Sequence, residues 1–331
     1  MGRWLVLGGT RFLSRAVAAA ALERGHEVLC AARGESGPVP DGATLVPVDR
    51  DVPGGLDALR GERFDAVVDV ARASLPWVRD ALDALGATAA HWTFVSTISV
   101  YADAAALGRG VDAPLLAPLD GGDPDRASEV YGGIKVASEN AVRAAAGERA
   151  LVVRAGLICG PGDRSDRFGY WPHRFARGGR AVVPDDPGQP LQIIDVRDLA
   201  AWVVASGERG LTGTFDGSGP RSTLGAVLAE IAAAVGAPDL QRVPVAPEAL
   251  TAAGVSPWSG PRSLPLWLPP SHLGIAARDT APAAAAGLRT RPVADTARDA
   301  AAHERTLDPG RTRRAGLTPT EEDALLTATG L

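Results

Sequence analysis

The stretch WLVLGGTRFLSRAVAAAALERGHEVL, residues 4–29, has the pattern of a buried strand, a glycine turn, a helix and a second strand. Gly8 allows the chain to leave the first strand sharply, and the helix that follows has free N–H groups at its N-terminus. Such an N-terminus is a binding site for a phosphate group. The usual three-glycine pattern of the turn is incomplete, because Arg11 and Ser14 replace the later glycines. The segment nevertheless predicts a phosphate-binding strand–turn–helix unit.

The same alternation of strand and helix continues along the chain. Apolar runs rich in branched residues predict buried strands at residues 3–8, 26–31, 43–48, 64–70, 91–96 and 150–158. Helix-forming segments that end at or near glycine occupy residues 13–25, 56–61 and 75–87. This period predicts an α/β fold with a parallel, doubly wound sheet. Residues 191–208 predict one further strand, followed by a helix that begins at an aspartate.

The pattern loosens toward the C-terminus. We expect residues 1–160, continued by 190–215, to form a dinucleotide-binding domain. Residues 161–189 and 216–331 are expected to form a smaller substrate-capping region, which includes a helix at 224–236. Residues 255–273 are rich in Pro and Trp and predict a lid or wall over a pocket, with a plain surface loop as the alternative.

Lys135 is the only lysine among 34 lysines and arginines, and it follows Tyr131 by four residues. On a helix this spacing puts both side chains on one face, one turn apart. An ammonium beside a phenol lowers the pKa of the tyrosine, which makes Tyr131 an acid–base group. The ammonium can also hold a ribose hydroxyl, so the pair predicts a nicotinamide cofactor nearby. The alternative is a solvated cation on the helix surface.

The composition narrows the range of partners. The net charge is −5, and both signs are scattered without a basic patch, so we expect no nucleic acid partner. No apolar run approaches the roughly 20 residues that span a bilayer, so we expect no membrane association. The first residues enter a strand directly and show no signal peptide, which predicts a cytoplasmic protein. Cys30 and Cys159 are expected to be buried free thiols, and the five histidines have no metal-ligand spacing, so we expect no metal.

Four motifs carry a family resemblance: GGTRFL at 8–13, FVSTISVY at 94–101, YGGIK at 131–135 and IIDVRDLA at 193–200. In this order and spacing they resemble the extended short-chain dehydrogenase/reductase family. More narrowly, they resemble its NAD-dependent epimerase/dehydratase-type members whose turn reads GGTRFLG. The resemblance covers nearly the whole chain and implies a Rossmann fold and a nicotinamide dinucleotide, but it does not specify a substrate.

The resemblance implies a catalytic triad of Thr97, Tyr131 and Lys135. Thr97 would hydrogen-bond the substrate oxygen and Tyr131 would transfer its proton. Lys135 would lower the pKa of Tyr131 and hold the nicotinamide ribose. The implied cofactor-binding residues are Gly8, Thr10, Arg11, Phe12, Leu13, Asp49, Arg50, Ala71, Gly156 and Leu157.

The charge of the residues that follow the second strand predicts whether the chain binds NAD or NADP. Members that use NAD carry an acid after the second strand, where this chain has Ala32 followed by Arg33. Arg33 and Arg11 are able to reach a 2′-phosphate, so we expect NADP, with NAD as the alternative. Arg33 as a solvated turn residue is the other interpretation.

Two departures from the family pattern bear on the reaction. Ile98 and Ser99 replace the Asp–Glu pair of sugar-nucleotide 4,6-dehydratases, which argues against that elimination. Leu191 and Gln192 replace the arginine with which sugar-nucleotide epimerases hold a diphosphate. Residues 162–180 are expected to line the substrate pocket. The candidate substrate contacts there are Tyr170, Trp171 and His173 for a ring and Arg167 or Arg174 for an acidic group, with packing as the alternative role of each.

The sequence thus predicts an NAD(P)-dependent oxidoreductase that acts on a carbonyl or secondary alcohol of a small, sugar-like molecule. An epimerase with tightly bound cofactor would use the same residues. A protein that binds NADP without catalysis, as a sensor or scaffold, is the alternative of another class. The resemblance also suggests a homodimer that pairs through residues 75–85 and the helix that carries Tyr131.

Overall fold

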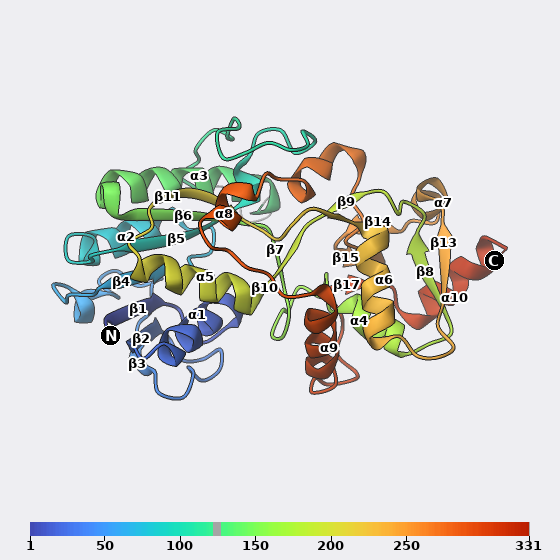
Figure 1. Ribbon diagram of the computed structural model, residues 1–331, viewed down its shortest axis with the longest axis horizontal. Helices are drawn as coiled ribbons and strands as arrows, with labels where there is room; N and C mark the ends of the chain where they lie inside the picture. The colour runs from blue at the N-terminus through green and yellow to red at the C-terminus, as the bar shows by residue number, and fades with distance from the viewer. Residues whose placement is uncertain (122–126, 331) are drawn as a thin grey trace.

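The computed structural model describes residues 1–121 and 127–330, and it consists of a sheet domain and a smaller part beside it (Figure 1). Seven strands form the central sheet in the order β11-β6-β5-β4-β1-β2-β3, and every neighbouring pair runs parallel. The predicted doubly wound parallel sheet is therefore confirmed. Its strands are β1 (Arg3–Leu7), β2 (Glu27–Ala32), β3 (Thr44–Pro47), β4 (Ala66–Asp69), β5 (Trp92–Thr97), β6 (Ala150–Ala155) and β11 (Gly213–Gly217).

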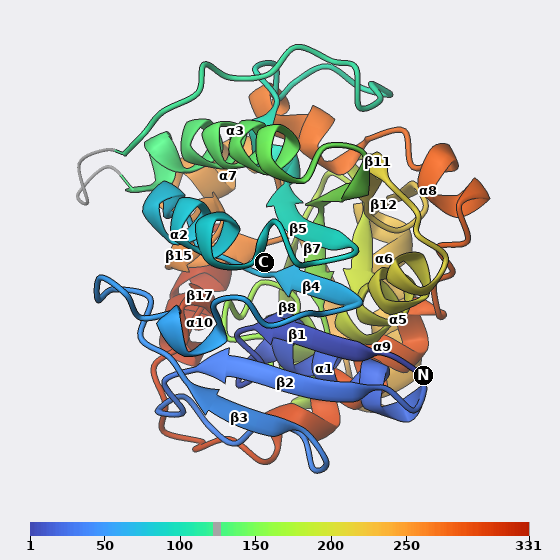
Figure 2. The ribbon, with the colours of Figure 1, turned by 90° about the vertical axis from the view of Figure 1, so that its left-hand side faces the viewer.

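Helices cover both faces of this sheet (Figure 2). On one face lie α1 (Phe12–Glu23) and α5 (Val196–Glu208), and on the other lie α2 (Leu75–Leu85) and α3 (Ala127–Ala146). Successive side chains of a strand point to opposite faces, so β1 contributes to two separate cores. Its Trp4 and Val6 pack with the α1 side, whereas its Leu5 and Leu7 pack with the α2 side. Burial on both faces explains why β1 is a continuous apolar run after Arg3.

The smaller part is built from short strand pairs and helices around its own apolar core. The pairs are β7 (Leu157–Cys159) with β10 (Ile193–Asp195), β8 (Arg180–Pro184) with β13 (Gln241–Val245), β9 (Pro190–Leu191) with β12 (Ser222–Thr223), β14 (Ser256–Trp258) with β16 (Ser263–Pro265), and β15 (Gly260–Pro261) with β17 (Ala315–Gly316). The remaining α-helices are α4 (Tyr170–Ala176), α6 (Leu224–Val235), α7 (Pro247–Ala252), α8 (Ala281–Ala285), α9 (Val293–Glu304) and α10 (Pro319–Ala328). Short 3₁₀ turns occupy Asp57–Leu59, Ile98–Val100, Gly147–Arg149 and Pro270–Ala276.

The structure corrects one strand assignment. The predicted strand within residues 191–208 does not extend the central sheet, because β9 and β10 pair outside it and β11 takes the seventh position. The buried Gln192 directs this segment away from the sheet, since its side-chain amide donates to Gly219 O at 3.1 Å and to Arg278 O at 3.0 Å. The helix after it does begin at an aspartate, because Asp195 accepts a hydrogen bond from the Arg197 amide at 2.9 Å.

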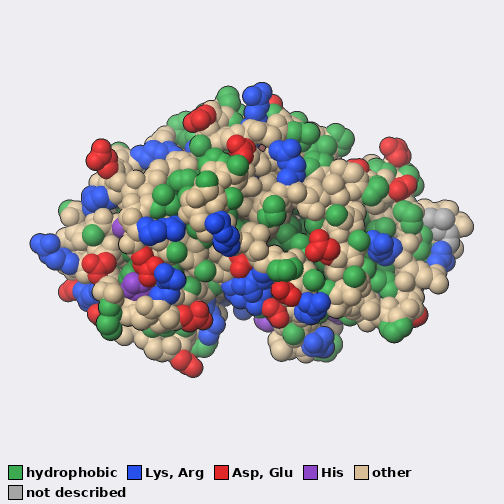
Figure 3. Space-filling model, viewed as in Figure 1, with side chains coloured by type: hydrophobic (Ala, Val, Ile, Leu, Met, Phe, Trp, Pro, Cys, Tyr) green, Lys and Arg blue, Asp and Glu red, His purple; other side chains and the backbone are tan. Residues whose placement is uncertain are grey.

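The boundary between the two parts is less simple than predicted. Although it belongs to the C-terminal region, α8 returns to the sheet domain, where Ala283 and Leu288 are buried against the α1 side of the sheet. On the face drawn in Figure 3, a notch separates the two parts at the lower edge, and charged side chains of both signs are interspersed. Within the described residues, no helix is long and apolar enough to cross a membrane.

The turn after β1 requires glycine because its backbone has positive φ angles and packs directly against Cys30 on β2. Gly8 and Gly9 have φ angles of 127° and 105°, which an L side chain rarely adopts. A Cβ atom on Gly9 would lie 2.4 Å from the Sγ atom and 2.6 Å from the Cβ atom of Cys30 on β2. Cys30 and Cys159 are buried free thiols, as predicted.

A Gly9→Ala substitution is expected to lower the free energy of unfolding by roughly 2–5 kcal/mol, from backbone strain and overpacking against Cys30. Gly25→Ala is the control, because Gly25 also has a positive φ, 81°, but a Cβ atom there meets nothing within 4 Å. The control is expected to cost about 1 kcal/mol. Denaturant unfolding measures both values, and equal losses would refute the steric argument.

Candidate active site

A cavity of about 580 Å³ lies at the carboxyl ends of the central strands. Residues that follow β4, β5 and β6 line it, together with the first residues of α1 and one face of α3. This edge of a doubly wound sheet is where such folds bind their ligands. Trp258 and Ile275, both from the C-terminal region, also line the cavity, and Trp258 is the member of the predicted wall segment 255–273 that does so.

Lys135 on α3 is buried, with 2% of its surface exposed, and it lines the cavity. Its ammonium donates to the backbone oxygens of Ala71 at 2.8 Å and Val95 at 2.7 Å, and it lies 4.6 Å from the centre of the Phe94 ring. The alternative of a solvated cation on the helix surface is therefore wrong. An ammonium has three protons, so one remains for a ligand in the cavity.

Tyr131 and Thr97 line the same cavity, so the structure brings the three predicted catalytic residues together. Tyr131 lies one turn before Lys135 on α3, and a hydrogen bond links it to Thr97. Thr97 ends β5, and its hydroxyl accepts a hydrogen bond from the Ser99 amide and donates one to the Ser99 hydroxyl, both at 3.2 Å. The backbone contact expected of a strand-end threonine is thus present alongside the contact with Tyr131.

The source of charge next to Tyr131 differs from the prediction. Burial raises the pKa of Tyr131, and this effect outweighs the hydrogen bond with Thr97 and the positive charge of Arg167, which both lower it. Lys135 is not among the groups that shift this pKa, and its predicted role in lowering it stays a prediction. Arg167 was expected only as a substrate contact, so its closeness to the phenol is a new feature of the site.

Several residues that were predicted to contact the cofactor line the cavity. Arg11, Phe12 and Leu13 line the cavity at the N-terminus of α1, and Ala71, Gly156 and Leu157 line it at the ends of β4 and β6. Among the described residues, no side chain caps the N-terminus of α1, so its N–H groups are available to an anion. Gly8 and Thr10 belong to the turn that leads into this helix and are not among the residues that line the cavity.

The other predicted cofactor contacts, Arg33, Asp49 and Arg50, lie outside this cavity. The Arg33 guanidinium is half exposed, 3.6 Å from Glu35 and 3.8 Å from Asp51. Asp49 accepts a hydrogen bond from the Asp51 amide at 2.9 Å. Arg50 is buried and lines a neighbouring cavity of about 520 Å³.

The partner of Arg50 is a residue that sequence reasoning missed. Asp69 ends β4 with none of its surface exposed and accepts hydrogen bonds from Arg50 at 2.9 and 3.3 Å. Arg50 also donates to Trp77 O at 2.7 Å. A charged residue at the end of the otherwise apolar run FDAVVDV was the available signal, since strand ends meet at this edge.

Four of the five predicted substrate contacts lie elsewhere. Tyr170 and Trp171 are buried in the core of the smaller part, where the Trp171 indole donates to Pro265 O at 2.9 Å. Arg174 is buried against Glu322, with Nε 2.6 Å from a carboxylate oxygen. His173 is exposed on α4. The buried side chains of the short helix α4 therefore pack the smaller part of the protein. The prediction that this helix contacts the substrate is wrong.

Arg167 is the one predicted substrate contact that lines the cavity. Its guanidinium lies 5.1 Å from the centre of the Trp258 ring. Asp163 lines the cavity beside it, and its carboxylate accepts hydrogen bonds from the amide and the hydroxyl of Ser165. Across residues 1–121 and 127–330, no group of three His, Cys, Asp or Glu side chains is arranged to hold a metal.

Comparison with known proteins agrees with this geometry. A UDP-glucose 4-epimerase of Thermus thermophilus, solved with NAD, is 20% identical, with a TM-score of 0.64 over 92% of this chain and 100% of that chain. A UDP-glucuronic acid 4-epimerase of Bacillus cereus, also solved with NAD, is 14% identical, with a TM-score of 0.65 over 94% and 98% of the two chains. These likenesses show the fold.

No curated protein sequence matches the chain significantly. The family model of the NAD dependent epimerase/dehydratase family matches residues 4–214, which is more than half of the chain. The chain therefore belongs to the NAD dependent epimerase/dehydratase family.

Proposed function

We propose that the protein is an NAD(P)-dependent oxidoreductase that acts on a carbonyl or secondary alcohol of a small, sugar-like molecule. The observation that carries the proposal is the meeting of Thr97, Tyr131 and Lys135 in one cavity at the carboxyl ends of β4, β5 and β6. When bound, the dinucleotide supplies the hydride donor or acceptor. Membership of the NAD dependent epimerase/dehydratase family supports this chemistry.

The residues of the cavity fit a dinucleotide. The uncapped N-terminus of α1 and the adjacent Arg11 suit a pyrophosphate. A Cβ atom on Gly156 would lie 2.4 Å from the Ser218 hydroxyl, so only glycine lets the backbone at this point of the cavity wall pack directly against Ser218. The third proton of the Lys135 ammonium is available to a ribose hydroxyl.

The proposed catalytic residues have two tasks, which are to bind the substrate oxygen and to transfer its proton. The Thr97 hydroxyl holds the substrate oxygen, and Tyr131 gives or takes its proton. Because burial keeps the pKa of Tyr131 raised, the phenol is protonated at neutral pH and ready to donate to a forming alkoxide. Arg167 and Thr97 then stabilise the phenolate that donation leaves behind.

We propose NADP as the preferred dinucleotide. Ala32 puts no carboxylate at the end of β2, and Arg33 next to it is half exposed. The ion pairs of Arg33 with Glu35 and Asp51 are long, at 3.6 and 3.8 Å, and such exposed pairs hold an arginine weakly. A 2′-phosphate would therefore compete well for Arg33. Tighter binding of NADPH than of NADH in a direct titration tests this choice.

An epimerase would use the same three residues in an oxidation followed by a reduction. The epimerases that share the fold favour this candidate. The two reactions differ in how the dinucleotide is held, because an epimerase regenerates it in each turnover. Denaturing the purified protein and assaying the supernatant separates them: stoichiometric dinucleotide supports the epimerase, and empty protein that binds added dinucleotide supports the net oxidoreductase.

A Tyr131→Phe variant is expected to bind the dinucleotide like the wild type but to lose turnover by about 10²–10⁴-fold. Turnover is measured with the substrate that a screen of sugars and aldehydes identifies. Tyr170→Phe is the matched control, because it removes a buried hydroxyl outside the cavity. Unchanged turnover in Tyr131→Phe would rule out the proposed acid–base role, and binding without turnover in the wild type would favour a sensor or scaffold.

The charge of Lys135 predicts a pH dependence of stability. Burial lowers the pKa of Lys135 from 10.5 to about 8, against the opposing charges of Asp69 and Glu139. The unfolded chain then binds more protons than the folded protein from about pH 8 to 10.5, so the free energy of unfolding rises with pH in that interval. We expect wild type to gain on the order of 3 kcal/mol over Lys135→Met across it.

Denaturant unfolding at a series of pH values measures this difference between wild type and Lys135→Met. Below about pH 8 the difference is expected to be constant, because both states keep the lysine protonated. A difference that stays flat up to pH 10.5 would show that the buried ammonium has an ordinary pKa.

A further inference from the structure

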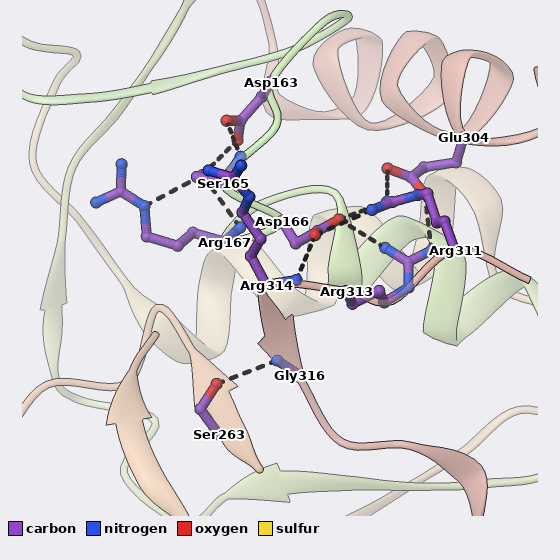
Figure 4. Close-up of polar contacts among 10 residues, drawn as sticks. All are labelled: Asp163, Ser165, Asp166, Arg167, Ser263, Glu304, Arg311, Arg313, Arg314 and Gly316. Atoms are coloured by element: carbon purple, nitrogen blue, oxygen red, sulfur yellow. Dashed lines mark hydrogen bonds and ion pairs between the residues drawn. The ribbon is translucent and has the colours of Figure 1, made fainter. Parts of the chain in front are cut away.

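Arg167 has terminal nitrogens that the rest of the site does not use. Its Nε atom donates to the Ser165 hydroxyl at 3.2 Å, and its guanidinium lies over the Trp258 ring. Figure 4 shows the two terminal nitrogens pointing away from the neighbouring acidic cluster. Within residues 1–121 and 127–330, these terminal nitrogens form no hydrogen bond or ion pair. By contrast, the nearby Arg311 and Arg313 are both paired with Asp166.

The loop holds Arg167 in place through a buried carboxylate. Asp166 is 1% exposed and has a φ of 61°. It accepts hydrogen bonds from the side chains of Arg311 and Arg313 and, at 2.8 Å, from the Arg314 amide (Figure 4). We name residues 311–314 the C-terminal clasp. Four donor contacts on one carboxylate fix the loop, so little side-chain entropy remains to be lost when Arg167 binds a partner.

Trp258 is partly buried against the apolar core of the smaller part. It ends β14 with a φ of 70°, a conformation that a bulky side chain rarely adopts. Unfavourable backbone conformations of this kind gather where a fold positions a binding residue. Two residues next to the Arg167 guanidinium, Asp166 in its own loop and Trp258 beneath it, thus have unfavourable backbone conformations.

The cavity lining contains more positive than negative side chains, and in the described part of the chain Arg167 makes no direct ion pair. Three cations line it: Arg11, Lys135 and Arg167. Arg11 stands at the phosphate end, and Lys135 is held by two carbonyl oxygens. The carboxylate that lines the cavity, Asp163, is held by Ser165 and makes no ion pair with Arg167 in the described part of the chain. Cations therefore outnumber carboxylates in the cavity lining by three to one, and the terminal nitrogens of Arg167 stay free for an anion.

We propose that Arg167, supported by Trp258, binds a carboxylate of the substrate, so that the substrate is a small sugar acid or hydroxy acid. The inference rests on the proposed function and specifies its substrate class. Two parallel N–H groups of one guanidinium match the two oxygens of a carboxylate. A single positive charge also suits this monoanion better than a phosphate dianion. Because Arg167 and Tyr131 line the same cavity, the carboxylate and the reacting carbon belong to the same small molecule.

Binding of matched pairs of molecules tests the proposal without knowledge of the natural substrate. The pairs are galacturonate with galactose, glucuronate with glucose, and lactate with propane-1,2-diol, and inorganic phosphate is a further probe. Calorimetric titrations use the full-length protein with saturating dinucleotide. We expect wild type to bind at least one acid about tenfold or more tightly than its uncharged partner.

Two variants test whether Arg167 causes the preference for the acid. Arg167→Gln is expected to abolish the preference for the acid while leaving dinucleotide affinity unchanged. Arg164→Gln is the matched control, because Arg164 is an exposed arginine on the same loop that does not line the cavity, and it is expected to keep the preference. A melting temperature for each variant confirms that it folds.

Three outcomes would overturn the inference: wild type that does not prefer any acid, an Arg167→Gln variant that keeps the preference, or phosphate that binds more tightly than every carboxylate. The titrations are repeated without dinucleotide to keep the two proposals apart. Acid binding that depends on Arg167 in a protein that binds no dinucleotide would overturn the proposed function alone. Dinucleotide binding without acid preference would overturn the substrate class alone.

Discussion

A buried ammonium connects the helix and the strand ends that together form the site. Lys135 binds the carbonyl oxygens of Ala71 and Val95, which stand at the ends of neighbouring strands, and so fixes α3 against the edge of the sheet. A charge without these partners would be costly at this depth. Arginine cannot replace it, because a planar fork with five donors does not fit where a compact ammonium bridges two carbonyls. The position of Tyr131, one turn away, depends on this contact.

The face of α3 that carries Lys135 bears a further buried charged residue. Glu139 lies one turn beyond Lys135, fully buried, and accepts hydrogen bonds from the Ser96 hydroxyl at 2.6 Å and from Arg154 at 3.0 and 2.8 Å. Tyr131, Lys135 and Glu139 thus follow one another at spacings of four along α3. The outermost residue lines the cavity, the middle one anchors the helix, and the innermost one joins α3 to β5 by a hydrogen bond and to β6 by an ion pair.

The fold and the meeting of Thr97, Tyr131 and Lys135 in one cavity were predictable because their signals are local. Each of these signals indicates the structure at its own position in the sequence. They are a glycine after a strand, runs of branched apolar residues, and a tyrosine four residues before a lone lysine. The misassigned residues were decided by distant partners. Trp171 and Arg174 looked like ring and anion contacts, but they meet Pro265 and Glu322, which lie 94 and 148 residues away. The buried pair of Arg50 and Asp69 depends likewise on strand order. Pairing of two copies through α2 and α3 stays a prediction.

The C-terminal clasp has a consequence for how the molecule is made. Its arginines follow Asp166 by 145 to 148 residues, so a growing chain contains the whole central sheet, Tyr131 and Lys135 long before it contains the clasp. Domains form from the N-terminus during synthesis. A nascent chain can therefore shape its dinucleotide turn first, whereas the loop that carries Arg167 acquires its donors only after residues 311–314 leave the ribosome.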